Sequence, residues 1–103
     1  MKNFKPYYAV IFTSTQTKYT KGYAEMADEM EALAKQQTGY LGVESARNEV
    51  GITVSYWESL EAIKAWKTNT KHLFAQHKGR KEWYNWYNVK ICKVEREYEF
   101  KLD

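Results

Sequence analysis

The segment YYAVIFTS, residues 7–14, constrains the fold more than any other part of the sequence. Its β-branched and aromatic residues are typical of a β-strand. Both alternate sets of side chains in this strand are apolar, with Tyr7, Ala9 and Ile11 on one side and Tyr8, Val10 and Phe12 on the other. A strand that has no polar side is normally covered on both sides. The sequence therefore predicts a sheet with packing against each of its faces.

An amphipathic helix is predicted over residues 23–37, YAEMADEMEALAKQQ. Its apolar residues recur at helical spacing, with acidic residues opposite them: Tyr23, Met26, Ala27, Met30, Leu33 and Ala34. Methionine at this spacing indicates core packing rather than a cofactor site. Gly39 is expected to end the helix as a left-handed residue.

Two further strands, LGVESARN and GITVSYW, flank a connection at residues 49–51 that is short enough for a hairpin. In the second strand the two sides are Ile52, Val54 and Tyr56, and Thr53, Ser55 and Trp57. Ser59 is expected to cap a helix that begins with LEAIKAWK, and Thr70 to cap a second short helix, KHLFAQHK. The helical region is thus predicted to be broken in two.

The last predicted strand is YNVKICKVEREYEF, residues 87–100. Its apolar residues change sides along the strand, from Val89 and Ile91 on one side to Cys92, Val94, Tyr98 and Phe100 on the other. Either a bulge lies near Ile91 and Cys92, or both sides of the strand are partly covered.

The predicted order is strand, helix, strand, strand, broken helix, strand. With short connections and right-handed crossovers, this order indicates an α+β fold, a ferredoxin-like antiparallel sheet with helices on one face. A chain of 103 residues is expected to form a single domain, residues 1–103. Because the helices leave one apolar side of the first strand uncovered, we expect a second copy to cover it in a homodimer.

Cysteine content and hydropathy exclude several classes of protein. Cys92 is the only cysteine, so no disulfide is expected, and no signal-like segment or long apolar run is present. These features predict a cytoplasmic protein without membrane association. Two histidines and one cysteine cannot supply the usual ligands of a structural zinc, so no metal site is expected.

Charge is distributed unevenly, with a balance of −2 over residues 1–63 and +5 over residues 64–103. A basic, aromatic-rich second part could attract anions or nucleic acid. However, the lysines there alternate with glutamates, which favours a solvated surface. The stretch KGYA, residues 21–24, imitates the start of an RNA-binding strand motif, but the sequence continues as a helix. We therefore expect no nucleic-acid partner.

Several motifs together resemble the antibiotic biosynthesis monooxygenase (ABM) domain family, and most closely its YqjZ-like subgroup. These motifs are GYLGVESAR, GITVSYW, AWK followed by a histidine, AQ, GR, WY and VEREY, and the resemblance extends from Tyr8 to Phe100. It implies a dimeric α+β barrel, in which two ferredoxin-like sheets pack face to face and each protomer has a cleft between its sheet and its helices.

The resemblance also implies an oxidoreductase, a small-molecule monooxygenase that oxidises an aromatic or quinol-like substrate without a cofactor. The alternative is a non-catalytic dimeric module that binds a ligand or heme. Oxygenation without a cofactor needs an aromatic pocket, a proton acceptor and donors that stabilise a phenolate.

Candidates for these roles lie mostly between residues 66 and 87. We predict His72 as the base and Trp66 beside it as the catalytic pair, because an unperturbed imidazole titrates near ~6.5. Arg80 could hold a phenolate or carboxylate, or pair with an acid such as Glu82. The predicted substrate-binding aromatic residues are Trp57, Trp83, Tyr84 and Tyr87. Core packing or dimer contact remains the alternative role for these rings.

A resemblance to the heme-degrading members of the family would imply three residues: an axial histidine, a tryptophan about ten residues before it, and an asparagine on the first strand. His77 and Trp66 nearly match, at a spacing of eleven residues, but residues 7–14 contain no asparagine. The departure argues against heme degradation and leaves heme binding open. A surface position is the alternative for His77.

Overall fold

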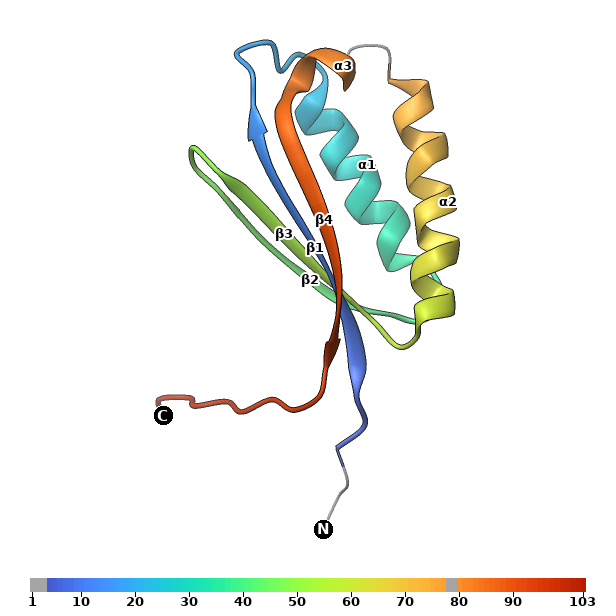
Figure 1. Ribbon diagram of the computed structural model, residues 1–103, viewed down its shortest axis with the longest axis vertical. Helices are drawn as coiled ribbons and strands as arrows, with labels where there is room; N and C mark the ends of the chain where they lie inside the picture. The colour runs from blue at the N-terminus through green and yellow to red at the C-terminus, as the bar shows by residue number, and fades with distance from the viewer. Residues whose placement is uncertain (1–3, 78–79) are drawn as a thin grey trace.

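The computed structural model describes residues 4–77 and 80–103 of the chain. The elements follow in the order β1 (Tyr7–Gln16), α1 (Tyr23–Lys35), β2 (Tyr40–Arg47), β3 (Gly51–Trp57), α2 (Leu60–Gln76), α3 (Arg80–Trp83) and β4 (Tyr84–Val94). The strands form one sheet in the order β2-β3-β1-β4, and each neighbouring pair is antiparallel. Both long helices lie on one face of the sheet (Figure 1). This is the predicted ferredoxin-like α+β arrangement.

Strand register divides the sheet into a helix-facing side and an outer side. Tyr8 pairs with Trp57, and Val10 and Phe12 follow Tyr8 on the same side. Tyr8 and Val10 pack against the core beneath the helices, so this is the helix-facing side. The predicted alternation in β1 and β3 is confirmed. None of the helices in residues 4–77 and 80–103 covers the outer side, which carries Tyr7, Ala9, Ile11, Ile52, Val54 and Tyr56.

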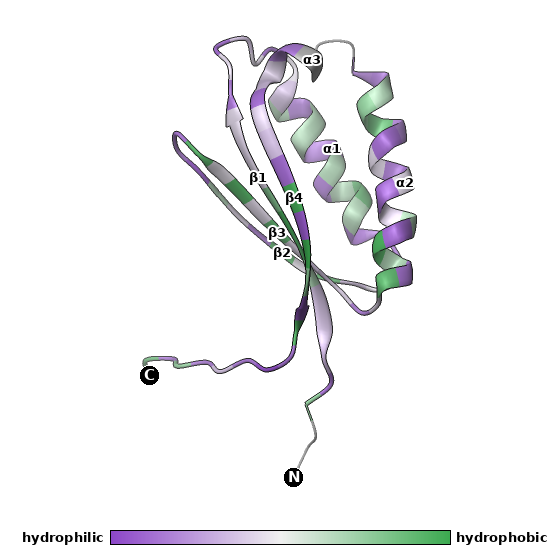
Figure 2. Cartoon of the chain, in the orientation of Figure 1, coloured by the Kyte–Doolittle hydropathy of each residue, from purple (hydrophilic) through white to green (hydrophobic). Residues whose placement is uncertain are grey.

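The core lies between the helices and the middle of the sheet. Its buried members are Ala34, Trp57, Ile63 and Trp66. Trp57 is fully buried and stacks on Trp66, with ring centroids 5.5 Å apart and planes at 28°. The apolar positions of α1 and α2 face this layer, as the alternation of green and purple along both helices indicates (Figure 2).

The predicted break in the second helical region is wrong, because α2 is continuous from Leu60 to Gln76. Ser59 caps it as expected, accepting a hydrogen bond from the backbone N–H of Ala62 at 3.1 Å. Thr70 instead donates its hydroxyl to the carbonyl of Lys67 at 2.8 Å. A threonine hydroxyl can bond either to a free N–H at a helix start or to a preceding carbonyl within a helix, and here it does the latter.

Gly39 adopts the left-handed conformation that was predicted, with φ of +87°. The helix itself ends earlier, at Lys35, and Gln36 is its C-terminal cap. Gly39 lies at the entry to β2, where an added Cβ would come within 2.7 Å of the Cβ of Ala62. Glycine at this position therefore allows the chain to turn close to α2.

Strand β4 runs from Tyr84 to Val94, whereas the predicted strand spans residues 87–100. Its register against β1 is unbroken at Ile91 and Cys92, which excludes the bulge and leaves the other predicted alternative, partial cover of both sides. The irregularity lies between Thr15 and Gln16, opposite the start of β4. The segment 95–103 leaves the sheet and extends to the side away from the helices (Figure 1).

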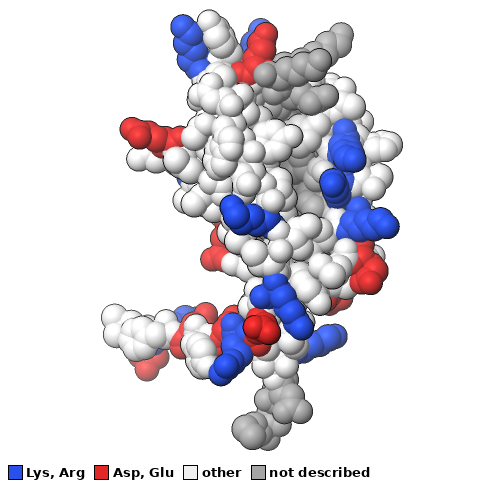
Figure 3. Space-filling view, viewed as in Figure 1, with Lys and Arg blue, Asp and Glu red and all other residues white. Residues whose placement is uncertain are grey.

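On the face drawn in Figure 3, basic side chains lie one below another along the side of α2, and an acidic side chain lies next to them. The other basic side chains on this face are scattered, with acidic side chains among them near the lower end. This arrangement agrees with the solvated charged surface that the sequence indicates. Within residues 4–77 and 80–103, no helix is both long and apolar enough to cross a membrane.

Candidate functional site

Four residues face one another in a row across one end of the sheet, on its helix-facing side. Arg47 of β2 pairs with Gly51 of β3, Gly51 pairs with Ser14 of β1, and Ser14 pairs with Tyr87 of β4. We call this the end row. Its two central positions are small residues, so the long side chain of Arg47 can lie across the sheet.

The guanidinium of Arg47 is positioned by three contacts. It lies directly on Gly51, since a Cβ at that position would come within 2.1 Å of the Arg47 Cζ. Its Nη2 donates to the hydroxyl of Ser14 at 2.5 Å, and Ser14 is fully buried. The guanidinium also lies over the ring of Tyr23, with Cζ 5.7 Å from the ring centroid. These contacts come from three different elements, β3, β1 and α1.

No carboxylate neutralises this charge within the part of the chain that the structure describes, because no Asp or Glu oxygen lies within 4.0 Å of Arg47. On the outer side of the sheet, by contrast, two phenols each have a carboxylate partner. Tyr56 donates to Glu44 at 2.6 Å, which raises the pKa of Tyr56 to about 12, and Tyr7 donates to Glu97 at 3.1 Å.

Aromatic rings surround the β4 end of the row. Phe12 stacks on Tyr87 with centroids 5.5 Å apart and planes at 27°, and meets Tyr84 edge-on at 5.7 Å. Tyr84 also meets Tyr23 edge-on, at 5.9 Å. The irregularity at Gln16 brings Tyr84 and Tyr87, which are three apart in sequence, to the same ring of Phe12.

The Tyr84 phenol is held in its neutral form. Burial raises the pKa of Tyr84 well above its usual range, the Tyr23 phenol adds to the rise, and the Arg47 guanidinium opposes it. Tyr84 is therefore a hydrogen-bond donor across the physiological pH range and cannot serve as a base. Gln16, which pairs with Tyr84, has a buried Nε2 without an acceptor among the described residues. The cation of the end row is thus bordered by uncharged polar groups.

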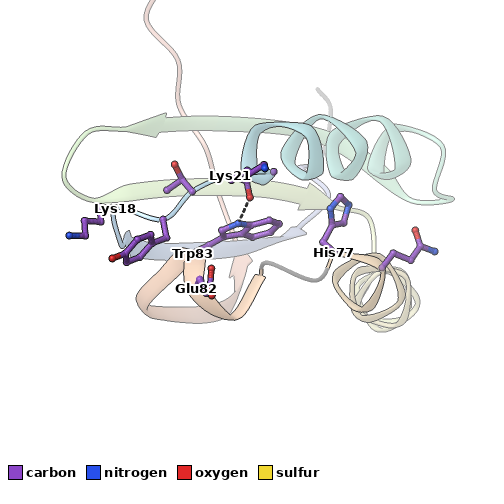
Figure 4. A pocket seen from close by; sticks show the side chains of 9 residues that line it. Lys18, Lys21, His77, Glu82 and Trp83 are labelled. Atoms are coloured by element: carbon purple, nitrogen blue, oxygen red, sulfur yellow. Dashed lines mark hydrogen bonds between the residues drawn. The ribbon is translucent and has the colours of Figure 1, made fainter.

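A hollow adjoins the aromatic cluster at the top of the sheet, with a volume of about 680 Å³. It lies between the β1–α1 loop and the end of α2, and Trp83 forms its floor (Figure 4). Trp83 is 1% exposed, and its Nε1 donates to the carbonyl of Lys21 at 2.8 Å. Its ring meets Tyr23 edge-on at 5.5 Å. Trp83 therefore connects this hollow to the residues around Arg47.

The structure distributes the other predicted site residues over separate places. Trp57 and Trp66 are stacked together in the core. His72 is exposed and lines a different hollow, between α1 and α2, with Leu33, Thr68, Asn69, Leu73 and Gln76. Trp66 and His72 thus lie on different sides of α2. The side chain of Arg80 lies outside the described residues, although its backbone begins α3.

His77 is engaged by its neighbours. Its Nε2 lies 2.9 Å from Oε2 of Glu29, and its ring centroid lies 5.9 Å from that of Trp83. An axial ligand of heme iron would need this nitrogen free, so the arrangement does not fit heme. Among the described residues, no three His, Cys, Asp or Glu side chains are grouped closely enough to hold a metal ion.

A family model named monooxygenase af470-like matches residues 6–96 of the chain. The chain belongs to this family. One relative is the uncharacterised protein YqjZ of Bacillus subtilis (strain 168). It is 49% identical to this chain over 98 residues, which cover 93% of this chain and 86% of YqjZ. The predicted resemblance to ABM-type monooxygenases and to YqjZ is thereby confirmed.

Solved structures share the fold of this family member at low sequence identity. SnoaB of Streptomyces nogalater, described as a cofactor-independent oxygenase, has a TM-score of 0.72 at 8% identity, over 91% of this chain and 97% of that chain. A Nitrosomonas europaea protein named for the antibiotic biosynthesis monooxygenases has a TM-score of 0.69 at 12% identity, over 92% and 95% of the two chains. Both show the ferredoxin-like α+β fold.

The sequence analysis named Tyr84 and Tyr87 as candidates but did not name their neighbours Arg47, Ser14 and Gly51. Two signals were present. Ser14 is a small polar residue that continues an otherwise apolar side of the first strand, and Gly51 opens a strand rather than a turn. In a hairpin of this length, Gly51 faces Arg47. A glycine directly opposite a long cation indicates that the cation lies across it.

Proposed function

We propose that this protein is a cofactor-free monooxygenase that oxidises a small aromatic molecule at the end row. The observation that carries the proposal is the guanidinium of Arg47, which lies beside phenol rings and has no carboxylate partner among the residues that the structure describes. Membership of the af470-like monooxygenases supports the reaction class. The shared fold with SnoaB, described as a cofactor-independent oxygenase, supports the absence of a cofactor.

The chemistry requires an electron-rich oxyanion. A guanidinium next to a bound phenol or quinol favours its ionised form and lowers the pKa of its hydroxyl. The Tyr84 phenol stays neutral, so it adds no negative charge that would oppose the ionised form of the substrate. The oxyanion then gives electrons to dioxygen. One oxygen atom is incorporated at an activated ring carbon, and the ring is oxidised to a quinone. The substrate loses two hydrogens in all, from that carbon and its hydroxyl groups, and they leave with the other oxygen atom as water, so the substrate supplies every electron.

His72 remains the base predicted from the sequence, and it lies apart from the end row. A reaction that depends on Arg47 and one that depends on His72 predict different effects of mutation on oxygen uptake with a naphthalene-1,4-diol as substrate. If the oxyanion is stabilised by Arg47, Arg47→Met lowers the rate by about 10²–10³-fold, the loss typical of one oxyanion donor. His72→Ala then changes it little.

The matched control is Lys64→Met, which removes an exposed positive charge from α2. A loss of about 10²–10⁴-fold in His72→Ala with an unaffected Arg47→Met would instead identify His72 as the base and contradict the proposed site. If the unmodified protein consumes no oxygen with any quinol, the protein is a ligand-binding module without turnover.

We also propose that the protein is a homodimer in which a second copy covers the outer side of the sheet. Ile52 and Trp86 are 45% and 50% exposed there, although both are large and apolar. Tyr98, Phe100 and Leu102 of the segment 95–103 are 85–86% exposed. Apolar surface of this extent favours association of two chains.

Sedimentation equilibrium at low micromolar concentration is expected to give twice the chain mass of 12.3 kDa. Ile52→Glu should shift the equilibrium towards the monomer, because it places a charge within the covered side. The control is Leu60→Glu, which changes a residue of similar exposure, 51%, on the helix layer. A monomeric parent protein, or equal dissociation of both variants, would contradict this interface.

A further inference from the structure

We infer that the end row selects planar aromatic substrates that carry a carboxylate, with Arg47 binding the carboxylate and the Phe12–Tyr87 stack binding the ring. The inference rests on the proposed function for the location of the substrate and adds its chemical class. Four observations support it, namely the unneutralised cation, its fixed orientation, the uncharged polar groups nearby and the accessible ring surface.

The exposed guanidinium of Arg47 has free hydrogen-bonding capacity that suits an anionic ligand. A guanidinium has five N–H donors, and the side-chain acceptor that Arg47 has in the described part of the chain is the Ser14 hydroxyl. The remaining donors are accessible to solvent, where an anion can replace water. The head group is turned across the sheet, onto Gly51 and against the ring of Tyr23, so its position is defined although the residue is exposed.

The shape of the donor group suits a carboxylate, and the five N–H donors leave others available for the phenol oxyanion of the same substrate. The guanidinium is planar, and two parallel N–H groups match the two oxygens of a carboxylate. A lysine would neutralise an anion at the same place without this match. The small residues at Gly51 and Ser14 fix the plane of the group, because a side chain at residue 51 would occupy its position.

The surroundings of Arg47 favour an aromatic body for the ligand. Tyr87 is 58% exposed while its ring stacks on Phe12, so one aromatic surface is open to a ligand. Tyr84 adds a neutral phenol and therefore no negative charge that would repel a carboxylate. With Arg47 on β2 and Tyr87 on β4, a bound molecule would lie along the end row with its carboxylate towards β2.

Two probes of equal ring size test this selectivity: 1-naphthoate and neutral 1-naphthalenemethanol, each titrated by calorimetry into the full chain. We expect the unmodified protein to bind naphthoate about 10–100-fold more tightly, the difference typical of a charge-assisted hydrogen-bonded pair. Arg47→Met should remove this preference. Binding of naphthalenemethanol should change little, because the aromatic rings are intact.

The variant Gly51→Ala tests whether the position of the Arg47 guanidinium matters in addition to its charge. The added Cβ must displace the end of the Arg47 side chain, which is flexible, while the net charge stays the same. We expect the preference for naphthoate to fall as in Arg47→Met, with an unchanged unfolding midpoint. Lys64→Met loses the same charge elsewhere and should keep the preference. Equal affinities in the unmodified protein, or equal losses in Lys64→Met and Arg47→Met, would overturn the inference.

The same titrations distinguish this inference from the proposed function. Tight naphthoate binding without oxygen uptake on any quinol or aromatic acid would overturn the proposed oxidation and uphold the anion site. Oxidation of naphthalene-1,4-diol by a protein that shows no preference for naphthoate would overturn the anion site alone.

Discussion

Replacing Trp57 by alanine is expected to lower the free energy of unfolding by about 3–5 kcal/mol, the usual cost of deleting a large buried aromatic side chain. Trp57 is 0% exposed and stacks on Trp66 at 5.5 Å. Its Nε1 also donates to the hydroxyl of Ser55 at 2.9 Å. Alanine would leave a cavity between β3 and α2 and remove the ring on which Trp66 rests. Domains of this size are stable by about 5–15 kcal/mol, so the loss is a large part of the total.

Urea unfolding at one fixed protein concentration measures this loss. Leu60→Ala is the matched control, because it also shortens a large apolar side chain but at a position that is 51% exposed. Its expected effect is below about 1 kcal/mol. If Trp57→Ala cost no more than Leu60→Ala, the Trp57–Trp66 stack would not be the centre of the core.

Local sequence patterns predicted most of the helices and strands, because the spacing of apolar side chains is set within a single element. Alternation in residues 7–12 and the polar cap at Ser59 are properties of single elements, and both predictions are confirmed. The predicted break at Thr70 was wrong because a threonine hydroxyl has two possible partners in a helix, and sequence does not choose between them. Leu73, which follows Thr70, is buried on α2 like Ile63 and Trp66, and this burial favours a continuous helix.

The end row could not be predicted from local patterns, because it depends on the register of all four strands. Arg47, Ser14 and Tyr87 are far apart in sequence and face one another only through antiparallel pairing. A shift of one residue in any pair would send one of these side chains to the outer side. Tyr84 and Tyr87 were found because aromatic density is visible in sequence, whereas their shared contact with Phe12 depends on the irregularity opposite Gln16.

The ring of Trp83 packs against Tyr23, and we therefore expect Trp83 to influence both the stability of the fold and the position of the Arg47 guanidinium. Trp83 is buried at 1% exposure, and its backbone carbonyl also accepts from the N–H of Thr17 at 2.9 Å. Its indole meets Tyr23 edge-on at 5.5 Å, and Tyr23 in turn lies over the guanidinium of Arg47. A change at Trp83 should therefore affect both the fold and the selection of anions, through Tyr23.

We expect Trp83→Ala to destabilise the protein by about 3–5 kcal/mol and to reduce the preference for 1-naphthoate over 1-naphthalenemethanol. Trp83→Phe keeps an aromatic ring against Tyr23 but loses the hydrogen bond to the Lys21 carbonyl, 2.8 Å long. Its expected cost is about 1–3 kcal/mol, from a carbonyl left without its donor, and the naphthoate preference should survive. Urea unfolding and calorimetric titration measure the two effects separately. If the phenylalanine variant lost the preference as fully as the alanine variant, the indole N–H rather than ring packing would position Tyr23 over Arg47.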